Sequence, residues 1–517
     1  MKTSKIIFIT ILLLALGFIH SGCNEDFLNQ DPQTSLSDNQ VFESLDNVQF
    51  FLDGLYFEWR FTRVNRRGFY LMLGTDESQQ GEYQMRTEAE QGGLDKYDGF
   101  YSEENKPIAE LWSIRWPIVV KAGMAIDQLN KLLENASKED SARINSFKGQ
   151  ASFYRGAVLL ELASYWGELP IPETTKNSIT LSAKRSIVDT YRMIENDLLT
   201  ASQLLSDKLN SADLRIPTKW AAMALLGKMY MSVPLSSGLR NYGNAKLQFL
   251  EIYNHGGFSL ATNVADLWDP TKQPGNEPIF TFYFTNTSPD TNQNQWYTGS
   301  RACAGNPTNY IGGYDLVLPT EYCRNDIEQG GLWEKGDLRK MESIRYDFIN
   351  GDNLPSPVAG FGEDQLLPHI KKYEDKRIDG KQSFYDSGKN IYYVRYADVL
   401  LSLAECMNET NETSAAVQLI NNTIRKRAWG GTLPSEYAWN PNMSQEDFRK
   451  NIMTERMREL CFEGWRRFDL IRTNNFVNYI KERNRWAKEA SLISEQHIYY
   501  PIPITEIKMN PNLSENK

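Results

Sequence analysis

The chain has 517 residues, of which 41% are hydrophobic and 24% are charged, an ordinary balance for a globular protein that buries a large core. Its formal net charge of −10 argues against nucleic acid or an anionic membrane surface as a partner. The 26 tyrosines and 12 tryptophans are a high number, and such rings suit both core packing and flat, uncharged ligands that stack on them.

The first 22 residues predict an export signal. Lys2 and Lys5 precede a nearly unbroken apolar run over residues 6–19, which is shorter than the roughly 20 residues that span a bilayer. Small residues then precede Cys23, an arrangement that resembles a lipoprotein processing site. We therefore expect Cys23 to become the lipidated N-terminus of the mature chain. A plain secretory signal with an incidental cysteine is the alternative.

Amphipathic helices account for most of the N-terminal half. Apolar residues recur at spacings of three and four, and Gly or Pro residues end several of the segments. This pattern predicts helices over residues 38–63, 108–135, 144–165, 187–205, 218–231 and 243–254. Residues 64–106 lack such a pattern and are rich in Gly, Glu, Gln and Tyr, so they predict a long loop of the kind that carries function.

The sequence pattern changes between residues 258 and 388. Residues 277–284 predict a strand, and most of the residues after this strand are polar, glycine or aromatic, which indicates an irregular insertion. Helical patterns return over residues 389–408, 413–428 and 452–473. The first of these is apolar on two sides and therefore predicts a helix sandwiched between neighbours. The fold class is mainly α, with a large irregular insertion that contains a short strand, and its antiparallel helix pairs resemble tetratricopeptide repeats. No strict repeat of about 34 residues is visible.

Several segments resemble one protein family. Residues 455–472, ERMRELCFEGWRRFDLIR, are similar to the C-terminal signature of the SusD/RagB family of surface glycan-binding lipoproteins, where this segment is scaffold. FYRGAVLLELASYWGELPI at residues 153–171, NIYYVRYADVLLSLAE at residues 390–405 and the tail YYPIPITEIKMNPNLSENK also resemble it. The resemblance covers nearly the whole mature chain and is weakest in residues 64–106 and 286–385.

This resemblance implies a bundle of degenerate helix pairs of the tetratricopeptide kind, in a single domain over residues 23–517. Its helical scaffold would cover about residues 38–257 and 389–475, its insertion about 258–388, and its C-terminal segment 476–517. The resemblance also implies a non-catalytic lipoprotein, anchored in the cell outer membrane and facing the exterior. Such a protein binds oligosaccharide or polysaccharide and delivers it to a SusC-like, TonB-dependent transporter.

The sequence carries no enzyme signature. Outside the predicted signal, histidine occurs only at positions 255, 369 and 497, without metal-ligand spacing, and no phosphate-binding loop, dinucleotide fingerprint or nucleophile elbow is present. Asp76 and Glu77 are adjacent, whereas glycosidase carboxylates face each other across a substrate. We expect no catalysis, no metal and no cofactor. The alternatives are a helical-repeat scaffold that binds protein or peptide and a glycoside hydrolase.

The cysteines after Cys23 fall into two groups. Cys406 and Cys461 lie on apolar helical stripes and predict buried thiols. Cys303 and Cys323 lie in the same insertion, and an exported chain would expose that insertion to an oxidising environment. A sequence does not supply the geometry of a disulfide, so the pairing of Cys303 with Cys323 stays open.

Aromatic residues in the two irregular segments are the best candidates for a ligand site. A sugar ring has an apolar face that Tyr or Trp covers and a rim of hydroxyl groups that polar side chains bind. The family resemblance points to the same two regions. The predicted ligand-binding residues are Asp76, Tyr83, Tyr97 and Tyr101 in the first segment and Trp296, Tyr297, Arg301 and Tyr314 in the second. The alternative is that each ring packs its own loop onto the scaffold.

Overall fold

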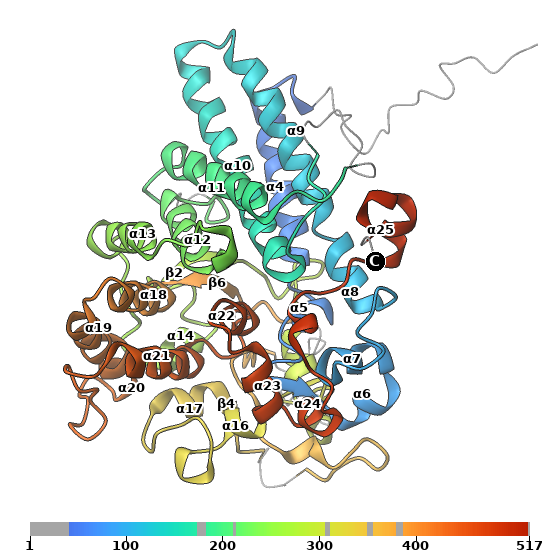
Figure 1. Cartoon of the computed structure of the whole chain (residues 1–517), viewed down its shortest axis with the longest axis vertical. Coiled ribbons are helices and arrows are strands. Elements are labelled where there is room, and N and C mark those ends of the chain that lie inside the picture. Colours follow the sequence, from blue (N-terminus) through green and yellow to red (C-terminus); the bar gives the residue numbers. More distant parts are fainter. Residues whose placement is uncertain are drawn as a thin grey trace, which may run out of the picture. The chain divides into compact units, whose positions relative to one another are not determined.

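Figure 1 shows the chain as a computed structural model. The structure describes residues 41–172, 182–209, 213–304, 311–348, 355–378 and 386–514. The predicted export signal, Cys23 and the start of the first predicted helix therefore lie outside the described residues. The chain divides into two compact units, residues 1–51 and 52–517, and helix α4 (Leu45–Phe61) begins in the first and ends in the second.

Long helices that pack on their neighbours in sequence build the first part of the second unit. They are α8 (Lys106–Ser113), α9 (Trp116–Leu133), α10 (Lys138–Trp166), α11 (Ile187–Leu204), α12 (Lys219–Ser232) and α13 (Tyr242–His255). Each of α8 to α12 contacts the helix that comes after it in this series, and Figure 1 shows α9 to α13 side by side. The predicted helix over residues 108–135 is interrupted at Ile114 and Arg115, because Pro117 starts a new helix.

Serine caps fix the start of two of these helices. The hydroxyl groups of Ser137 and Ser186 each accept a hydrogen bond, 3.1 Å long, from the backbone N–H three residues further on. Since the Ser137 cap comes before the first strongly apolar position, α10 begins earlier than the predicted residue 144.

The second part of the scaffold packs onto α13. Helix α18 (Tyr396–Glu409) contacts α13, α19 (Thr413–Ile420) and α21 (Gln445–Leu460), and most of its side chains are buried. This burial on all sides is what the two apolar stripes predicted, and the mainly α fold is confirmed. The remaining helical elements of this part are η7 (Asn421–Arg425), α20 (Lys426–Ala428), α22 (Arg466–Arg472), α23 (Phe476–Arg483), α24 (Arg485–Ala490), η8 (Glu495–His497), α25 (Ile504–Met509) and η9 (Pro511–Leu513).

The prediction of one continuous helix over residues 452–473 is wrong, because a buried turn separates α21 from α22. Phe462 and Gly464 in this turn have φ angles of 65° and 83°, which a right-handed helix excludes. The apolar stripe nevertheless runs through the turn, since Cys461 and Phe462 are as completely buried as the core side chains of α21.

Residues 391–395, predicted as the start of a helix, form strand β6 (Ile391–Arg395) instead. This strand pairs antiparallel with β2 (Pro278–Phe282), which confirms the strand predicted over residues 277–284. The sequence of β6, IYYVR, is rich in the β-branched and aromatic residues that favour strands. The helix was predicted from the spacing of apolar residues alone, which does not take this strand preference into account.

Two further ladders organise the irregular segments. Strand β1 (Ser78–Gln80) pairs antiparallel with β3 (Val317–Pro319), and β4 (Ile344–Arg345) pairs antiparallel with β5 (His369–Ile370). The predicted loop over residues 64–106 is broken into α5 (Arg67–Tyr70), α6 (Glu82–Thr87) and α7 (Ala89–Lys96). The other short elements are η3 (Leu235–Ser237), α14 (Val264–Trp268), α15 (Asn294–Thr298), η4 (Arg301–Cys303), α16 (Glu321–Arg324), η5 (Ile327–Gln329), α17 (Leu338–Ser343) and η6 (Asp364–Leu366).

Charged side chains of α21 and α22 are buried in ion pairs. Arg456 lies between Asp398 and Asp469, at 2.8 Å from each. Arg395 of β6 lies 2.6 Å from Glu459. Because a buried charge is tolerated only when it is fully paired, these contacts fix α18, α21, α22 and β6 relative to one another. The segment with the family signature is thus part of the core.

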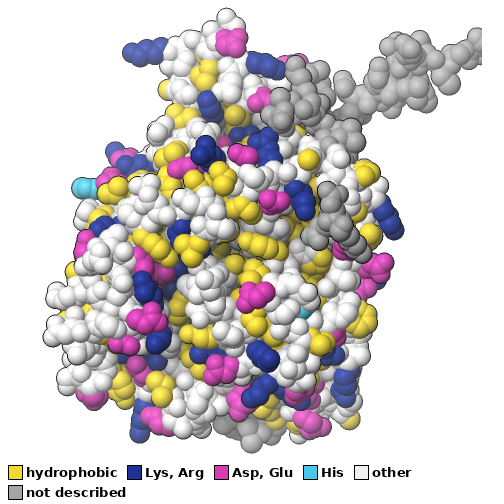
Figure 2. Space-filling view, viewed as in Figure 1, with side chains coloured by type: hydrophobic (Ala, Val, Ile, Leu, Met, Phe, Trp, Pro, Cys, Tyr) yellow, Lys and Arg dark blue, Asp and Glu magenta, His cyan; other side chains and the backbone are white. Residues whose placement is uncertain are grey.

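The surface carries both signs of charge. On the face shown in Figure 2, acidic and basic side chains are interspersed, and apolar side chains gather in a band across the middle. Within the part of the chain that the structure describes, no helix is both long and apolar enough to cross a membrane.

Candidate functional site

The ladder between β1 and β3 brings the two predicted segments together. Helix α6 follows β1 directly, and the backbone N–H of Gly81 donates to the carbonyl of Leu316 at 3.2 Å. A Cβ at Gly81 would overlap the carbonyl oxygen of Asp315, so this approach requires glycine. Gln84 of α6 then donates to the carbonyl of Tyr314 at 2.7 Å. Helix α6 is thereby held against the segment that precedes β3.

Three aromatic rings surround one guanidinium group at this junction and a fourth ring stacks on one of them, and we call these five residues the ring cluster. The guanidinium carbon of Arg301 lies 4.1 Å from the ring centroid of Phe361, 4.2 Å from that of Tyr314 and 5.0 Å from that of Tyr83. Trp296 stacks on Tyr314 with centroids 6.1 Å apart and planes 28° apart. All five side chains are half-buried, so each packs on one side and reaches solvent on another.

Polar contacts fix the guanidinium at the centre of the ring cluster. The backbone N–H of Arg301 donates to Asp315 Oδ1 at 2.8 Å, and its guanidinium donates to the carbonyl of Tyr314 at 3.1 Å. Asp315 is buried, with Oδ2 3.6 Å from Arg301 Nε and Oδ1 3.0 Å from His369 Nε2. Attraction between the cation and the ring faces adds to these bonds. The rings therefore form one surface with a fixed cation within it.

Close backbone packing places Trp296 beside Tyr314. Trp296 lies on α15, and the chain after α15 runs against Gly312 and Gly313. A Cβ at Gly313 would overlap the carbonyl oxygen of Trp296 and lie 2.5 Å from the Cα of Gly299. Gly299 and Gly313 are thus both needed for the chain after α15 to come this close to the segment before β3.

Phe361 comes from a third segment, which the sequence analysis missed. The loop that carries it is attached to α6: the backbone N–H of Glu82 donates to Asp364 Oδ2 at 2.7 Å, and that of Glu363 donates to Glu82 Oε2 at 2.9 Å. Burial raises the pKa of Asp364 to about 6. The only sequence signal for this contact is a phenylalanine between two glycines, at residues 360–362.

Asp76 is not part of the ring cluster. Its side chain is completely buried and accepts two hydrogen bonds of 2.7 Å from Arg466 and one of 3.1 Å from Arg483. The predicted ligand carboxylate is therefore a structural one, because both of its oxygens are used to hold the start of α22 and the end of α23 near β1.

Tyr97 and Tyr101 are also structural. Tyr97 is buried in an apolar cluster with Leu470 and Phe476, and its hydroxyl donates to the carbonyl of Gly74. Tyr101 packs against that cluster and donates to the carbonyl of His497 at 2.9 Å. The interpretation in which each ring packs its own loop onto the scaffold thus describes these two tyrosines.

Tyr297 lies next to Trp296 but turns towards the scaffold. Its hydroxyl donates to Gln293 Oε1 at 3.0 Å, and its ring meets the buried ring of Phe69 with centroids 5.9 Å apart. The structure therefore brings together Tyr83, Trp296, Arg301 and Tyr314 of the predicted residues, and leaves Tyr297 at the edge of that group.

Comparison with known proteins identifies the family. A model described as the SusD family matches residues 276–517, and a second, described as starch-binding and associating with the outer membrane, matches residues 26–231. The chain belongs to the SusD family. The match to SusD-like protein P2 of Formosa agariphila is 25% identical and covers 100% of this chain and 99% of the relative. The match to starch-binding protein SusD of Bacteroides thetaiotaomicron is 21% identical over 86% and 87% of the two chains.

Solved structures share the SusD fold. A SusD homologue from Bacteroides thetaiotaomicron superposes with a TM-score of 0.75 at 19% identity, over 93% of this chain and 99% of that one. A laminarin-binding SusD-like protein superposes with a TM-score of 0.73 at 20% identity, over 90% and 97%. At these identities the structures establish the fold of the chain.

The sequence left the pairing of Cys303 with Cys323 open. Cys303 and Cys323 are both buried thiols that are not bonded to each other. Cys323 lies near Cys461, at the turn between α21 and α22, and burial raises the pKa of the Cys323 thiol. Cys406 and Cys461 are buried thiols, as the apolar stripes predicted.

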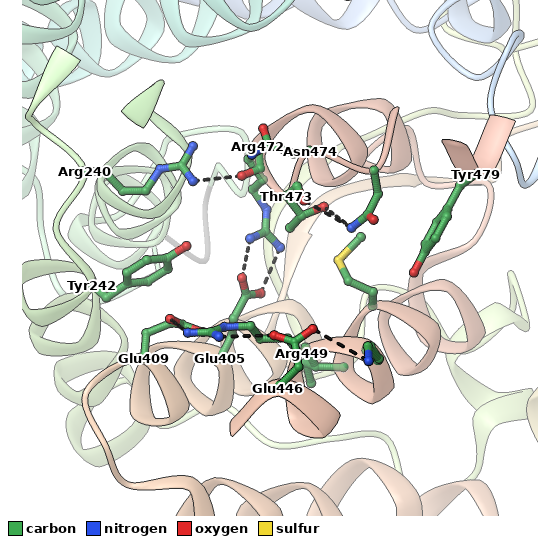
Figure 3. A pocket seen from close by; sticks show the side chains of 14 residues that line it. Arg240, Tyr242, Glu405, Glu409, Glu446, Arg449, Arg472, Thr473, Asn474 and Tyr479 are labelled. Carbon is green, nitrogen blue, oxygen red and sulfur yellow. Dashed lines mark hydrogen bonds and ion pairs between the residues drawn. The ribbon is translucent and has the colours of Figure 1, made fainter. Parts of the chain in front are cut away.

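A polar cavity of about 360 Å³ lies away from the ring cluster, between α13, α18, α21 and α23. Figure 3 shows Tyr242 and Tyr479 at its opposite ends. Arg472 at its floor donates to Glu405 at 2.9 Å, and Arg449 at its rim donates to Glu409 at 2.8 Å. Because these charges pair with one another and the two rings are not stacked, this cavity is a weaker ligand candidate than the ring cluster.

Within the described ranges, no set of three or more His, Cys, Asp or Glu side chains is placed to hold a metal ion. The carboxylates nearest the ring cluster, Asp315 and Asp364, are buried and accept hydrogen bonds that hold Arg301 and α6.

Proposed function

We propose that the ring cluster binds an oligosaccharide or polysaccharide and does not cleave it. The observation that carries this proposal is the half-buried group of three rings around the Arg301 guanidinium and a fourth ring stacked on one of them, assembled from three segments far apart in the chain. Trp296 and Tyr314 offer a stacked, flat surface for the apolar face of a sugar. The hydroxyls of Tyr83 and Tyr314 and the fixed guanidinium offer hydrogen bonds to its rim.

Relatives support a carbohydrate ligand. The similar proteins include a starch-binding protein and a laminarin-binding one, and one matching family model is described as starch-binding. That model is also described as associating with the outer membrane. The proposal therefore extends to a lipoprotein anchored through Cys23 in the outer membrane and facing the exterior. There it delivers the bound glycan to a SusC-like, TonB-dependent transporter.

One observation favours a glycoside hydrolase as the second candidate. Asp364 lies next to the ring cluster, and its raised pKa of about 6 is in the range of a general acid. Its carboxylate, however, is bound to the backbone of α6, and the neighbouring carboxylate of Glu82 is bound to the backbone of Glu363 and to Arg485. Reducing-end release from polysaccharide by the purified protein would favour the hydrolase. Its absence, together with binding, supports a binding protein.

Retention by polysaccharide tests the proposed function. The wild-type chain and a Trp296→Ala/Tyr83→Ala variant are run in native gels that contain one polysaccharide each, including starch and laminarin. We expect a polysaccharide that slows the wild type to lose its effect on the double variant. The proposal fails if the variant is retained as strongly as the wild type.

A matched variant controls for the loss of surface rings in general. Trp429 and Tyr437 form another stacked pair, with centroids 5.0 Å apart, on half-buried side chains outside the ring cluster. A Trp429→Ala/Tyr437→Ala variant should keep the retention of the wild type. Thermal unfolding of all three proteins separates lost binding from lost folding.

A further inference from the structure

A groove of about 810 Å³ lies beside the ring cluster and is lined by α6, α7, α24 and the residue Phe100. Its apolar surface includes Phe100, which is 48% exposed, and the half-buried ring of Trp486. The indole N–H of Trp486 donates to the carbonyl of Gln80 at 2.7 Å. Since Gln80 belongs to β1, the same ladder that positions the ring cluster also holds this second aromatic surface.

The groove and the ring cluster meet at Arg86. Residues of an α-helix advance by about 100° each, so Arg86, which lines the groove, lies about 60° around α6 from Tyr83. The guanidinium of Arg86 donates to the carbonyl of Gly360 at 3.4 Å, directly before Phe361. Arg86 therefore connects the lining of the groove with the loop that carries Phe361 of the ring cluster.

The groove has an excess of positive charge, although the chain as a whole carries −10. Its lining holds Arg86, Lys96 and Arg485 against Glu82 and Glu489. Arg485 pairs with both carboxylates, at 3.0 Å from Glu82 and 2.9 Å from Glu489. The charges of Arg86 and Lys96 act on Glu82 and Asp95, respectively, but neither cation makes a direct ion pair among the residues that the structure describes. Arg86 is exposed. Two cations at one end of a sugar site favour a ligand with negative charge.

We propose that the groove binds a second stretch of the same glycan chain, and that this stretch carries an acidic substituent, a carboxylate or a sulfate ester. The proposal rests on the proposed function, because it extends the ligand held by the ring cluster. Trp486 and Phe100 contact the apolar faces of the sugars in the groove. Arg86 and Lys96 bind the acidic group.

Polymers that differ only in charge test this inference. The pairs are polygalacturonate with its methyl ester, and dextran sulfate with dextran, and affinity is measured for each at physiological salt. We expect the wild type to bind the acidic member of at least one pair about tenfold more tightly than the neutral member, from one or two charged contacts. An Arg86→Gln/Lys96→Gln variant should lose that tenfold difference and keep its affinity for neutral polymers and for laminarin or starch.

A Lys481→Gln/Lys488→Gln variant is the control, because it removes the same charge from two exposed lysines of α23 and α24 that do not line the groove. If this control loses the affinity difference between acidic and neutral polymers as fully as Arg86→Gln/Lys96→Gln does, the acidic polymers are attracted by positive charge anywhere on the surface, and the inference is overturned. Equal affinity of the wild type for both members of every pair would also overturn it, while retention through Trp296 would leave the proposed function standing. No retention by any polymer, neutral or acidic, would end both.

Discussion

Arg301 holds Tyr314 in two ways at once: its guanidinium lies 4.2 Å from the ring centroid of Tyr314 and donates a 3.1 Å hydrogen bond to the carbonyl oxygen of the same residue. Asp315, the next residue, accepts the backbone N–H of Arg301. The Arg301 side chain therefore positions both the ring and the backbone of Tyr314, and Trp296 stacks on that ring.

Arg301→Ala should lower glycan affinity more than the removal of one ring does. The substitution removes the group that holds the ring of Tyr314. It also leaves buried Asp315 without its guanidinium neighbour, and the loss of such a partner typically lowers the free energy of unfolding by about 1–3 kcal/mol. Arg301→Lys should recover part of the stability and little of the affinity, because a lysine lacks the planar fork. Calorimetric titration and thermal unfolding of both variants test this. Wild-type affinity in Arg301→Ala would rule out its central role.

Gly313→Ala should disturb the ring cluster through the backbone. The added Cβ meets the carbonyl of Trp296, so the two chains must separate, at a cost of about 1–3 kcal/mol. The free energy of unfolding, from denaturant titration, should fall by that amount, and glycan retention should weaken. Gly54→Ala is the matched control, since nothing lies within 4 Å of a Cβ at that helical position. This control should be neutral or stabilising by up to about 1 kcal/mol.

The buried ion pairs predict a large difference between two arginines. Arg395 is enclosed and contacts Glu277, Glu459 and Glu463, so Arg395→Ala leaves carboxylates buried without a partner and should cost about 3–5 kcal/mol. Arg449, whose side chain is 45% exposed, also makes bidentate contacts, but its replacement by alanine should cost at most about 1 kcal/mol. Comparable losses in the two variants would contradict the assignment of the signature segment to the core.

The buried carboxyl of Glu455 predicts how the stability of the protein changes at low pH. Burial by itself would raise the pKa of Glu455, but the guanidinium groups of Arg339, Arg425 and Arg458 outweigh it and lower the pKa to about 2. A carboxyl with a depressed pKa adds stability that is present above its unfolded pKa and is lost as the pH falls through its folded pKa. The stability difference between wild type and Glu455→Gln should therefore shrink between about pH 4.5 and pH 2.

Denaturant titrations at several pH values measure this difference. Glu446→Gln, on the exposed side of the same helix, should stay within about 0.5 kcal/mol of wild type at each pH. A difference for Glu455→Gln that stays constant down to pH 2 would show that the guanidinium groups do not hold its carboxylate ionised.

Cys23→Ala should release the chain from the membrane fraction. The prediction follows from the sequence, because Cys23 lies outside the described residues. Labelling of cells with an alkyne fatty acid should mark the wild type and not the variant, while Cys406→Ala should be marked like the wild type. Fatty-acid labelling of Cys23→Ala equal to that of the wild type would mean that the signal is a plain secretory one.

Helical periodicity was enough to predict most of the scaffold, since long amphipathic segments bury one stripe wherever they pack. It failed where local conformation depends on distant partners. The turn at Phe462 and Gly464 keeps the apolar spacing of a helix, and β6 shows its strand preference only once β2 lies beside it.

Aromatic composition predicted the right regions and only part of the site. Tyr83 and Tyr97 look alike in sequence, yet one reaches solvent and the other donates to the backbone of Gly74 inside the core. The difference arises because Tyr97 packs against Leu470 and Phe476 of the C-terminal helices, a distant contact that no local pattern encodes. Phe361 was missed for the same reason, because its contact with Arg301 spans 60 residues.

The β1–β3 ladder has three residues on each side, and two of the three ring-bearing segments adjoin it. Among the described residues, few side chains join these segments to the helices, one of them being Glu82, which pairs with Arg485 of α24. A chimera that receives residues 81–87, 294–316 and 360–362 of a relative should therefore bind the glycan of that relative, if the ring cluster is the binding site that we propose.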